Sequence, residues 1–288
     1  MAPGPADAAI ARPRAARQLL LALLGEYVVG RDAPVPAAAI IDALVGAGAS
    51  VAAVRTALDR ATDHGLLRRH RLGREVLFEL TETGTGVLEE GANRVHLDAP
   101  FEPAGAGWTL VTFSMPEGQR RLRHQLRAAL TWAGFAPLRD GLWLAPGEVD
   151  VDTALGGLAE ALPPAAMVAF RARDLPGFGV DEAVRAAWDI DGIRAEHVRF
   201  AEAWDHPGAA AGVGALSARV MLVADWLALL RADPRLPRSY FGADWPAERS
   251  LRAYRARLAE LGERSEKEFA RLADRPLGDA SSSTLVAV

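Results

Sequence analysis

The chain has 288 residues, half of them hydrophobic, which is enough to bury a core and suggests two or three domains. It contains no cysteine, which excludes disulfides, thiolate metal sites and a cysteine nucleophile, and we expect a reducing cytoplasm. The formal net charge is only −4, so any attraction to nucleic acid must come from local clusters of basic residues, nearly all of them arginine.

The first 97 residues predict three helices followed by a basic hairpin. Apolar periodicity predicts helices over residues 14–30, about 36–45 and onward from Ser50, whose hydroxyl is placed to cap the third. The apolar run from Leu19 to Leu24 is too short to span a bilayer and predicts a buried helix. Two strands between Leu66 and Leu80 meet at a tight turn at Leu72 and Gly73. This order predicts a winged helix-turn-helix domain over residues 1–97.

The third helix and the hairpin carry the candidate DNA contacts. Val51, Val54, Leu58 and Ala61 fall on one helical face, which leaves a polar face to project from the core. A helix of this kind fits the major groove, while arginines of a hairpin can follow the phosphate backbone. The candidates are Arg55, Thr56, Asp59 and Arg60 on the helix, and Arg68, Arg69, Arg71 and Arg74 on the hairpin. Asp59 would repel phosphate, so we expect it to face a base or to pair with an arginine.

The middle of the chain, residues 108–175, predicts a β-α-β-β-α-β unit of ferredoxin-like type after a linker over 98–107. Its strands are expected at 108–114, 135–138, 142–145 and 167–173, and its helices at about 116–133 and 151–162. The first of these helices exposes Arg120, Arg121, Arg123 and Arg127. They could contact DNA, but such a row is more typical of a solvated helix face.

Residues 181–288 predict a helical effector or dimerisation domain, with amphipathic stretches at 181–204, 216–231 and 247–272 around a proline-rich turn. Trp188, Trp204, Trp226 and Trp245 could stack on a ligand, although large aromatics at helical spacing are more often core residues. Arg219 could hold an anionic group or form an internal salt bridge. The effector-binding candidates are therefore Arg219, Trp188 and Trp226.

No catalytic or metal-binding motif is present in the sequence. The histidines are scattered, and Glu196-His197 with Asp205-His206 lacks the spacing of a helical zinc pair. There is no serine elbow, phosphate loop or dinucleotide fingerprint. We therefore expect no enzyme, no cofactor, no metal and no membrane partner.

Several separate segments resemble the PaaX family of bacterial transcriptional regulators. In the first domain they are 54–60 (Val-Arg-Thr-Ala-Leu-Asp-Arg), 65–67 (Gly-Leu-Leu), 71–74 (Arg-Leu-Gly-Arg) and 80–81 (Leu-Thr). The middle domain adds 108–113, Pro116 and 141–143 (Gly-Leu-Trp), and the last adds 233–237 (Asp-Pro-Arg-Leu-Pro) and 244–246 (Asp-Trp-Pro). Together they cover most of the chain in the family's order.

The resemblance implies a homodimeric repressor that binds a palindromic operator and leaves it when a small-molecule effector binds between the middle and C-terminal regions. For the best-known members the effector is an aryl-acyl coenzyme A thioester, phenylacetyl-coenzyme A. Family members tend to carry a histidine, an aromatic residue and an arginine before the Asp-Pro motif, whereas this chain has Val-Ala-Asp-Trp-Leu at 223–227. If those polar groups serve the ligand, this protein senses a different molecule or none.

Two other readings compete with that of a regulator. The winged helix could be a protein-interaction module, although a hairpin used for protein contact should not need four arginines. The middle domain resembles the small CRISPR-associated spacer-acquisition nucleases, whose first strand supplies an acidic residue for metal-dependent chemistry. Here that strand ends in Thr112-Phe113-Ser114 without a carboxylate, which argues against a nuclease.

Overall fold

The computed structural model describes residues 13–274, apart from residues 140, 164, 176 and 178, together with residues 286–287. Its contacts divide the chain into two compact units. The first joins residues 1–98 to 198–228 and 248–288, and the second joins residues 99–197 to 229–247. The division runs through helices α10 (Ile190–Trp204) and α11 (Ala215–Ala232), so the units do not follow chain order.

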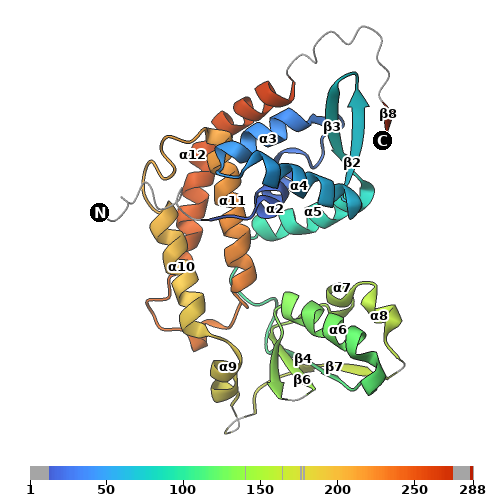
Figure 1. The fold of residues 1–288 in the computed structure, drawn as a ribbon. Helices are drawn as coiled ribbons and strands as arrows, with labels where there is room; N and C mark the ends of the chain where they lie inside the picture. Colours follow the sequence, from blue (N-terminus) through green and yellow to red (C-terminus); the bar gives the residue numbers. More distant parts are fainter. Residues whose placement is uncertain are drawn as a thin grey trace. The chain divides into compact units, whose positions relative to one another are not determined.

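The first unit begins with helices packed around α2 (Figure 1). They are α2 (Ala16–Tyr27), α3 (Ala37–Gly46), α4 (Val51–Asp63) and α5 (Glu82–Val95). The predicted apolar run is buried, since Leu19, Leu20, Leu23 and Leu24 are each at most 1% exposed. Helices α4 and α5 pack against α2, which carries these leucines. The packing is favourable because it removes several large apolar side chains from water.

The hairpin of the first unit consists of β2 (Leu67–Leu72) and β3 (Glu75–Leu80), as the sequence predicted. Two short strands extend it, so that the sheet order is β1-β3-β2-β8. Strand β1 (Val35–Pro36) pairs with β3, and β8 (Val286–Ala287) pairs with β2 at Arg71 and His70. The sequence indicated neither of these two-residue strands, because segments this short carry no periodic pattern.

The second unit contains the predicted β-α-β-β-α-β order around an antiparallel sheet. Its strands are β4 (Trp108–Phe113), β5 (Ala136–Arg139), β6 (Leu142–Pro146) and β7 (Met167–Ala172), arranged as β5-β6-β4-β7. Helix α6 (Arg120–Trp132), entered through a 3-10 turn (Glu117–Gln119), covers one face, where Leu126 and Leu130 pack on Val111 and Trp143. The other face packs Trp108 and Leu144 against α9 (Asp181–Ala187).

Two helices that the sequence predicted as continuous are interrupted. The helix expected over 151–162 is divided into α7 (Val151–Leu155) and α8 (Leu158–Ala161), because Gly156 takes a left-handed conformation with φ of 51°. The stretch 181–204 breaks after α9, where Asp189 accepts a hydrogen bond from the Gly192 amide (2.9 Å) and so caps α10. Periodicity alone does not reveal such interruptions, since the apolar spacing continues across them.

The C-terminal part of the first unit is formed by α11 and α12 (Ala247–Ala273), beside the second half of α10. The Trp226 ring is stacked on Tyr254 at 4.3 Å with nearly parallel planes, and Phe200 lies 5.4 Å away.

Among the described helices, none is both long and apolar enough to cross a membrane.

Candidate nucleic-acid interface

Helix α4 presents the polar face that its sequence predicts. The Ser50 hydroxyl accepts a hydrogen bond from the Ala53 amide (3.2 Å), which fixes the start of the helix. Val54, Ala57, Leu58 and Ala61 are buried. Arg55, Thr56, Asp59 and Arg60 are all exposed. Val51 departs from the prediction, since it lies in the first turn of the helix and is 43% exposed.

The four arginines of the hairpin do not have the same environment. Arg68 forms an ion pair with Glu79 on the neighbouring strand (2.9 Å), and Arg69 forms one with Asp59 of α4. Arg71 and Arg74 flank the tip at Gly73, where φ is +60°, and both are exposed. Neither forms an ion pair with another residue that the structure describes. Positive charge is therefore left uncompensated at the tip and largely neutralised at the base of the hairpin.

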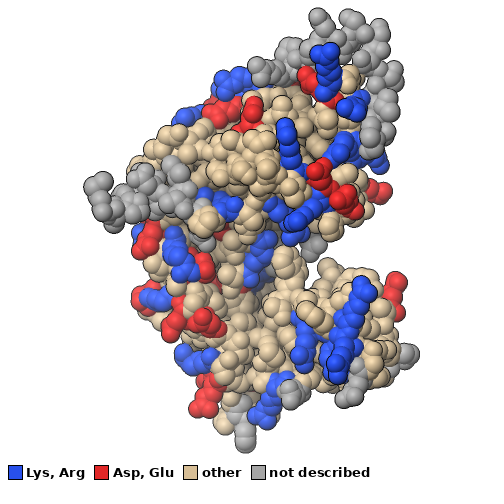
Figure 2. All heavy atoms as spheres, viewed as in Figure 1, with Lys and Arg blue, Asp and Glu red and all other residues tan. Residues whose placement is uncertain are grey.

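Asp59 connects the helix to the hairpin. The sequence left two roles open for this carboxylate, facing a base or pairing with an arginine. In the structure it pairs with Arg69. The Arg69 guanidinium also lies 5.5 Å from the centre of the Phe78 ring. The pair holds β2 beside α4, so that the exposed arginines of both elements belong to one surface. Figure 2 shows basic side chains over α4 and the hairpin, with acidic side chains between them.

A hollow of about 790 Å³ lies along α4, and sequence reasoning missed it. Its apolar walls include Leu20 and Leu21 of α2 and Val87 of α5, and Thr56 and Arg60 of α4 also line it. The lining comes from three helices that are distant in sequence, so no local motif could have indicated it. Any molecule bound in this hollow would contact two of the side chains that we predict to contact DNA.

Arg219, the candidate for holding an anionic effector, is engaged inside the first unit. Its guanidinium contacts the Glu26 carboxylate at 2.8 Å and donates to the Ser265 hydroxyl at 3.3 Å. It also lies 5.4 Å from the centre of the Tyr27 ring. Burial raises the pKa of Tyr27 to about 12, so the phenol beside Arg219 stays protonated at neutral pH. A ligand anion would compete with Glu26 for this arginine.

The two tryptophan candidates lie in different units. Trp226 is fully buried, and its indole N–H points to the carbonyl of Val95 (3.4 Å). Trp188 belongs to the second unit, where its ring lies 6.4 Å from that of Trp108. Both rings are occupied by aromatic neighbours of the protein itself, and their contact with an effector stays a prediction.

Models of three protein families match in succession: PaaX-like protein over residues 15–84, PaaX protein central Cas2-like domain over 102–181, and PaaX-like protein C-terminal domain over 188–271. No curated protein matches the chain.

One similar solved structure is that of an uncharacterized protein, Rv0674, from Mycobacterium tuberculosis. It is 23% identical, with a TM-score of 0.57, and the match covers 88% of this chain and 98% of that one. At this level of identity the likeness concerns the fold alone.

Proposed function

Because the chain belongs to the PaaX-like protein family, whose members are typically transcriptional regulators, we propose that it is a sequence-specific DNA-binding repressor. In this proposal residues 1–97 act as a winged helix-turn-helix, with α4 in the major groove and the β2–β3 hairpin along the phosphate backbone. The middle domain is Cas2-like and the C-terminal region is helical. In the proposal the middle domain, of ferredoxin-like type, spans residues 108–175, and residues 181–288 serve effector binding and dimerisation.

The observation that supports the proposal most directly is the distribution of uncompensated charge on one surface. Arg55, Arg60, Arg71 and Arg74 are exposed and have no ion-pair partner among the described residues. Exposed guanidinium groups that are not ion-paired can bind phosphates. A guanidinium group that enters the major groove can also donate two hydrogen bonds to a guanine. We assign Arg71 and Arg74 to phosphates, and Arg55 and Thr56 to base edges.

The dimer and the effector belong to the same proposal. A homodimer would place its two helices in successive major grooves, about 34 to 36 Å apart, on a palindromic operator. An effector such as an aryl-acyl coenzyme A thioester would release the DNA. Arg219, Trp188 and Trp226 remain the candidate contacts, and the hollow along α4 adds a place where ligand and DNA would compete.

Replacing Arg71 and Arg74 with alanine should weaken binding to every DNA sequence and reduce its salt dependence. Each lost phosphate contact lowers the slope of log affinity against log salt by about 0.9, so we expect a slope smaller by about 2. The measurement is a salt titration of the purified protein with the intergenic DNA upstream of its gene and with a random duplex. Phenylacetyl-coenzyme A and free coenzyme A are added in parallel.

The matched control replaces Arg252 and Arg264, two exposed arginines of α12 without an ion-pair partner among the described residues. It removes the same charge from the same unit and should leave the slope unchanged. An unchanged slope in the hairpin variant would remove the hairpin from the proposed interface. Equal, weak binding to both duplexes by the wild-type protein would contradict the proposed function.

Asp59→Asn should strengthen binding to DNA of any sequence. The substitution removes a negative charge from the proposed interface and releases Arg69 from its ion pair. One more arginine then becomes available for phosphate, and we expect an affinity several-fold higher and a slope steeper by about 1 in the same salt titration. Asp63→Asn, which changes an exposed aspartate at the end of α4, is the control for the general effect of charge. Weaker binding by Asp59→Asn would instead indicate that the carboxylate accepts a hydrogen bond from a base.

A further inference from the structure

Helix α6 of the second unit carries positive charge with no compensating acid. Its 13 residues include Arg120, Arg121, Arg123, His124 and Arg127 and contain no aspartate or glutamate. Arg123 donates to the Met115 carbonyl (2.6 Å), while Arg120, Arg121 and Arg127 are exposed and form no ion pair within the described part of the chain. Figure 2 shows the resulting basic patch on the second unit.

An ordinary solvated helix face has a different composition. Helix α12 of the same protein carries arginines alternating with glutamates, and it forms the pairs Arg257–Glu260 and Lys267–Glu263 within itself. In α6, by contrast, like charges lie four residues apart at Arg123 and Arg127, and two arginines occupy the first turn, where the helix dipole disfavours positive charge. The arrangement is unfavourable for the helix itself, so folding does not explain it.

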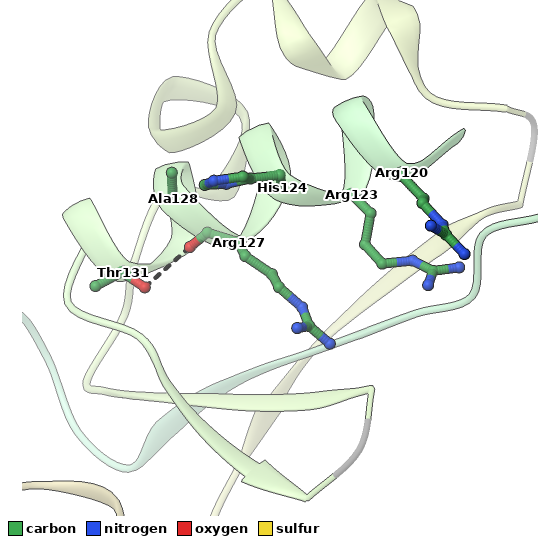
Figure 3. Close-up of a pocket in the computed structure, with 6 residues that line it drawn as sticks. All are labelled: Arg120, Arg123, His124, Arg127, Ala128 and Thr131. Carbon is green, nitrogen blue, oxygen red and sulfur yellow. Dashed lines mark hydrogen bonds between the residues drawn. The ribbon is translucent and has the colours of Figure 1, made fainter. Parts of the chain in front are cut away.

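The geometry of the patch fits an extended anion. In Figure 3, Arg120, Arg123 and Arg127 extend from α6 toward the same side, along an open depression of about 490 Å³. Arg120 and Arg127 are seven residues apart, which corresponds to about 10.5 Å along the helix axis. One strand of B-DNA has a phosphate about every 3.4 Å of its axis, so a row of this length can reach more than one phosphate of a strand. A single small anion would occupy only part of this row, because Arg127 lies about two helical turns from Arg120.

We propose that α6 is a second DNA-binding surface, which holds the phosphate backbone of double-stranded DNA without reading its sequence. The inference rests on the proposed function and adds a contact outside the winged helix-turn-helix. Arg120 and Arg127 supply the phosphate contacts, and Arg123, held by the Met115 carbonyl, adds positive potential beside them. The surface raises affinity for all sequences and leaves the discrimination between them to α4.

The test compares two variants of the full-length protein that lose equal charge from different elements of the second unit. Arg120→Gln with Arg127→Gln alters the patch. Arg139→Gln with Arg185→Gln alters β5 and α9, whose exposed arginines have no ion-pair partner among the described residues. Binding to a random 40-base-pair duplex is titrated from 50 to 200 mM salt. For two lost contacts the slope falls by about 1.8, so the loss of affinity over this range should be about tenfold smaller in the α6 variant than in the wild type.

The control variant should behave as the wild type, and thermal unfolding should show that the α6 variant is folded and no less stable. Equal slopes for the α6 variant and its control would overturn the inference, while a reduced slope for Arg71→Ala with Arg74→Ala would still support the proposed function. If the α6 variant lost binding to free coenzyme A in calorimetry but kept its DNA slope, the patch would be a small-anion site and the inference would be wrong. If the slope fell in the α6 variant but not in Arg71→Ala with Arg74→Ala, α6 would remain a DNA contact and the hairpin would no longer be one.

Discussion

Asp225→Ala is expected to lower the free energy of unfolding by about 3 to 5 kcal/mol, because it removes a buried carboxylate that accepts hydrogen bonds from the Arg14 guanidinium and the Trp204 indole. Asp225 is 2% exposed and accepts hydrogen bonds from the Arg14 guanidinium (2.6 and 2.9 Å) and from the Trp204 indole (3.0 Å). These contacts connect the start of the chain to α10 and α11, so the loss should be visible in denaturant unfolding followed by circular dichroism.

The control for this prediction is Asp205→Ala, which removes an exposed ion pair with Arg249 (2.6 Å) in the same unit. Exposed pairs contribute about 1 kcal/mol or less, so the control should change stability little. Similar losses from the two substitutions would mean that Asp225 is not the buried anchor that the geometry indicates.

Trp226→Ala should cost about 3 to 5 kcal/mol of folding free energy, as for other fully buried large aromatic residues. The substitution removes the stacked contact with Tyr254 and the packing on Phe200, and it leaves a cavity that the surrounding helices cannot fill. Trp226→Phe preserves an aromatic ring in the same place and should cost clearly less. Unfolding in urea, followed by circular dichroism, measures both.

Trp132→Ala provides the matched control, since the Trp132 ring is 64% exposed and has a cation–π contact with Arg231. Its loss should cost about 1 kcal/mol or less. If Trp226→Ala were as mild as this control, the ring would not hold the first unit together and would be a stronger candidate for effector contact. The expected large cost indicates instead that its main role is in the core.

Much of the local structure could be predicted from the sequence. The buried leucines of α2, the capping serine of α4 and the turn at Gly73 each depend on neighbouring residues, which is why periodicity and turn chemistry located them. The β-α-β-β-α-β order of the second unit followed from the same signals. The interruptions at Gly156 and Asp189 could not be predicted from these signals. Each depends on the backbone conformation or the capping side chain of one residue, within an apolar pattern that otherwise continues.

The candidate interface was only partly predictable. The eight candidates that the sequence offered on α4 and the hairpin include the four residues that we assign to phosphates and base edges, and the basic row of α6 was left between two interpretations. The sequence could not separate Arg68 and Arg69, which are paired with carboxylates, from Arg71 and Arg74, which are not. Ion pairs of this kind join strands or a strand and a helix, so they exist only once the elements are packed.

The sequence by itself determined the family of this protein, the order of its elements and the residue types available to bind phosphate, since each follows from composition and short-range spacing. Only the tertiary structure decided which charges remain available. It paired Asp59 with Arg69 and Arg219 with Glu26, buried Asp225 beside Arg14, and left the arginines at the hairpin tip and along α6 without acidic partners among the described residues. Whether a charge is neutralised depends on distances of a few ångströms between residues far apart in the chain, and folding alone sets those distances.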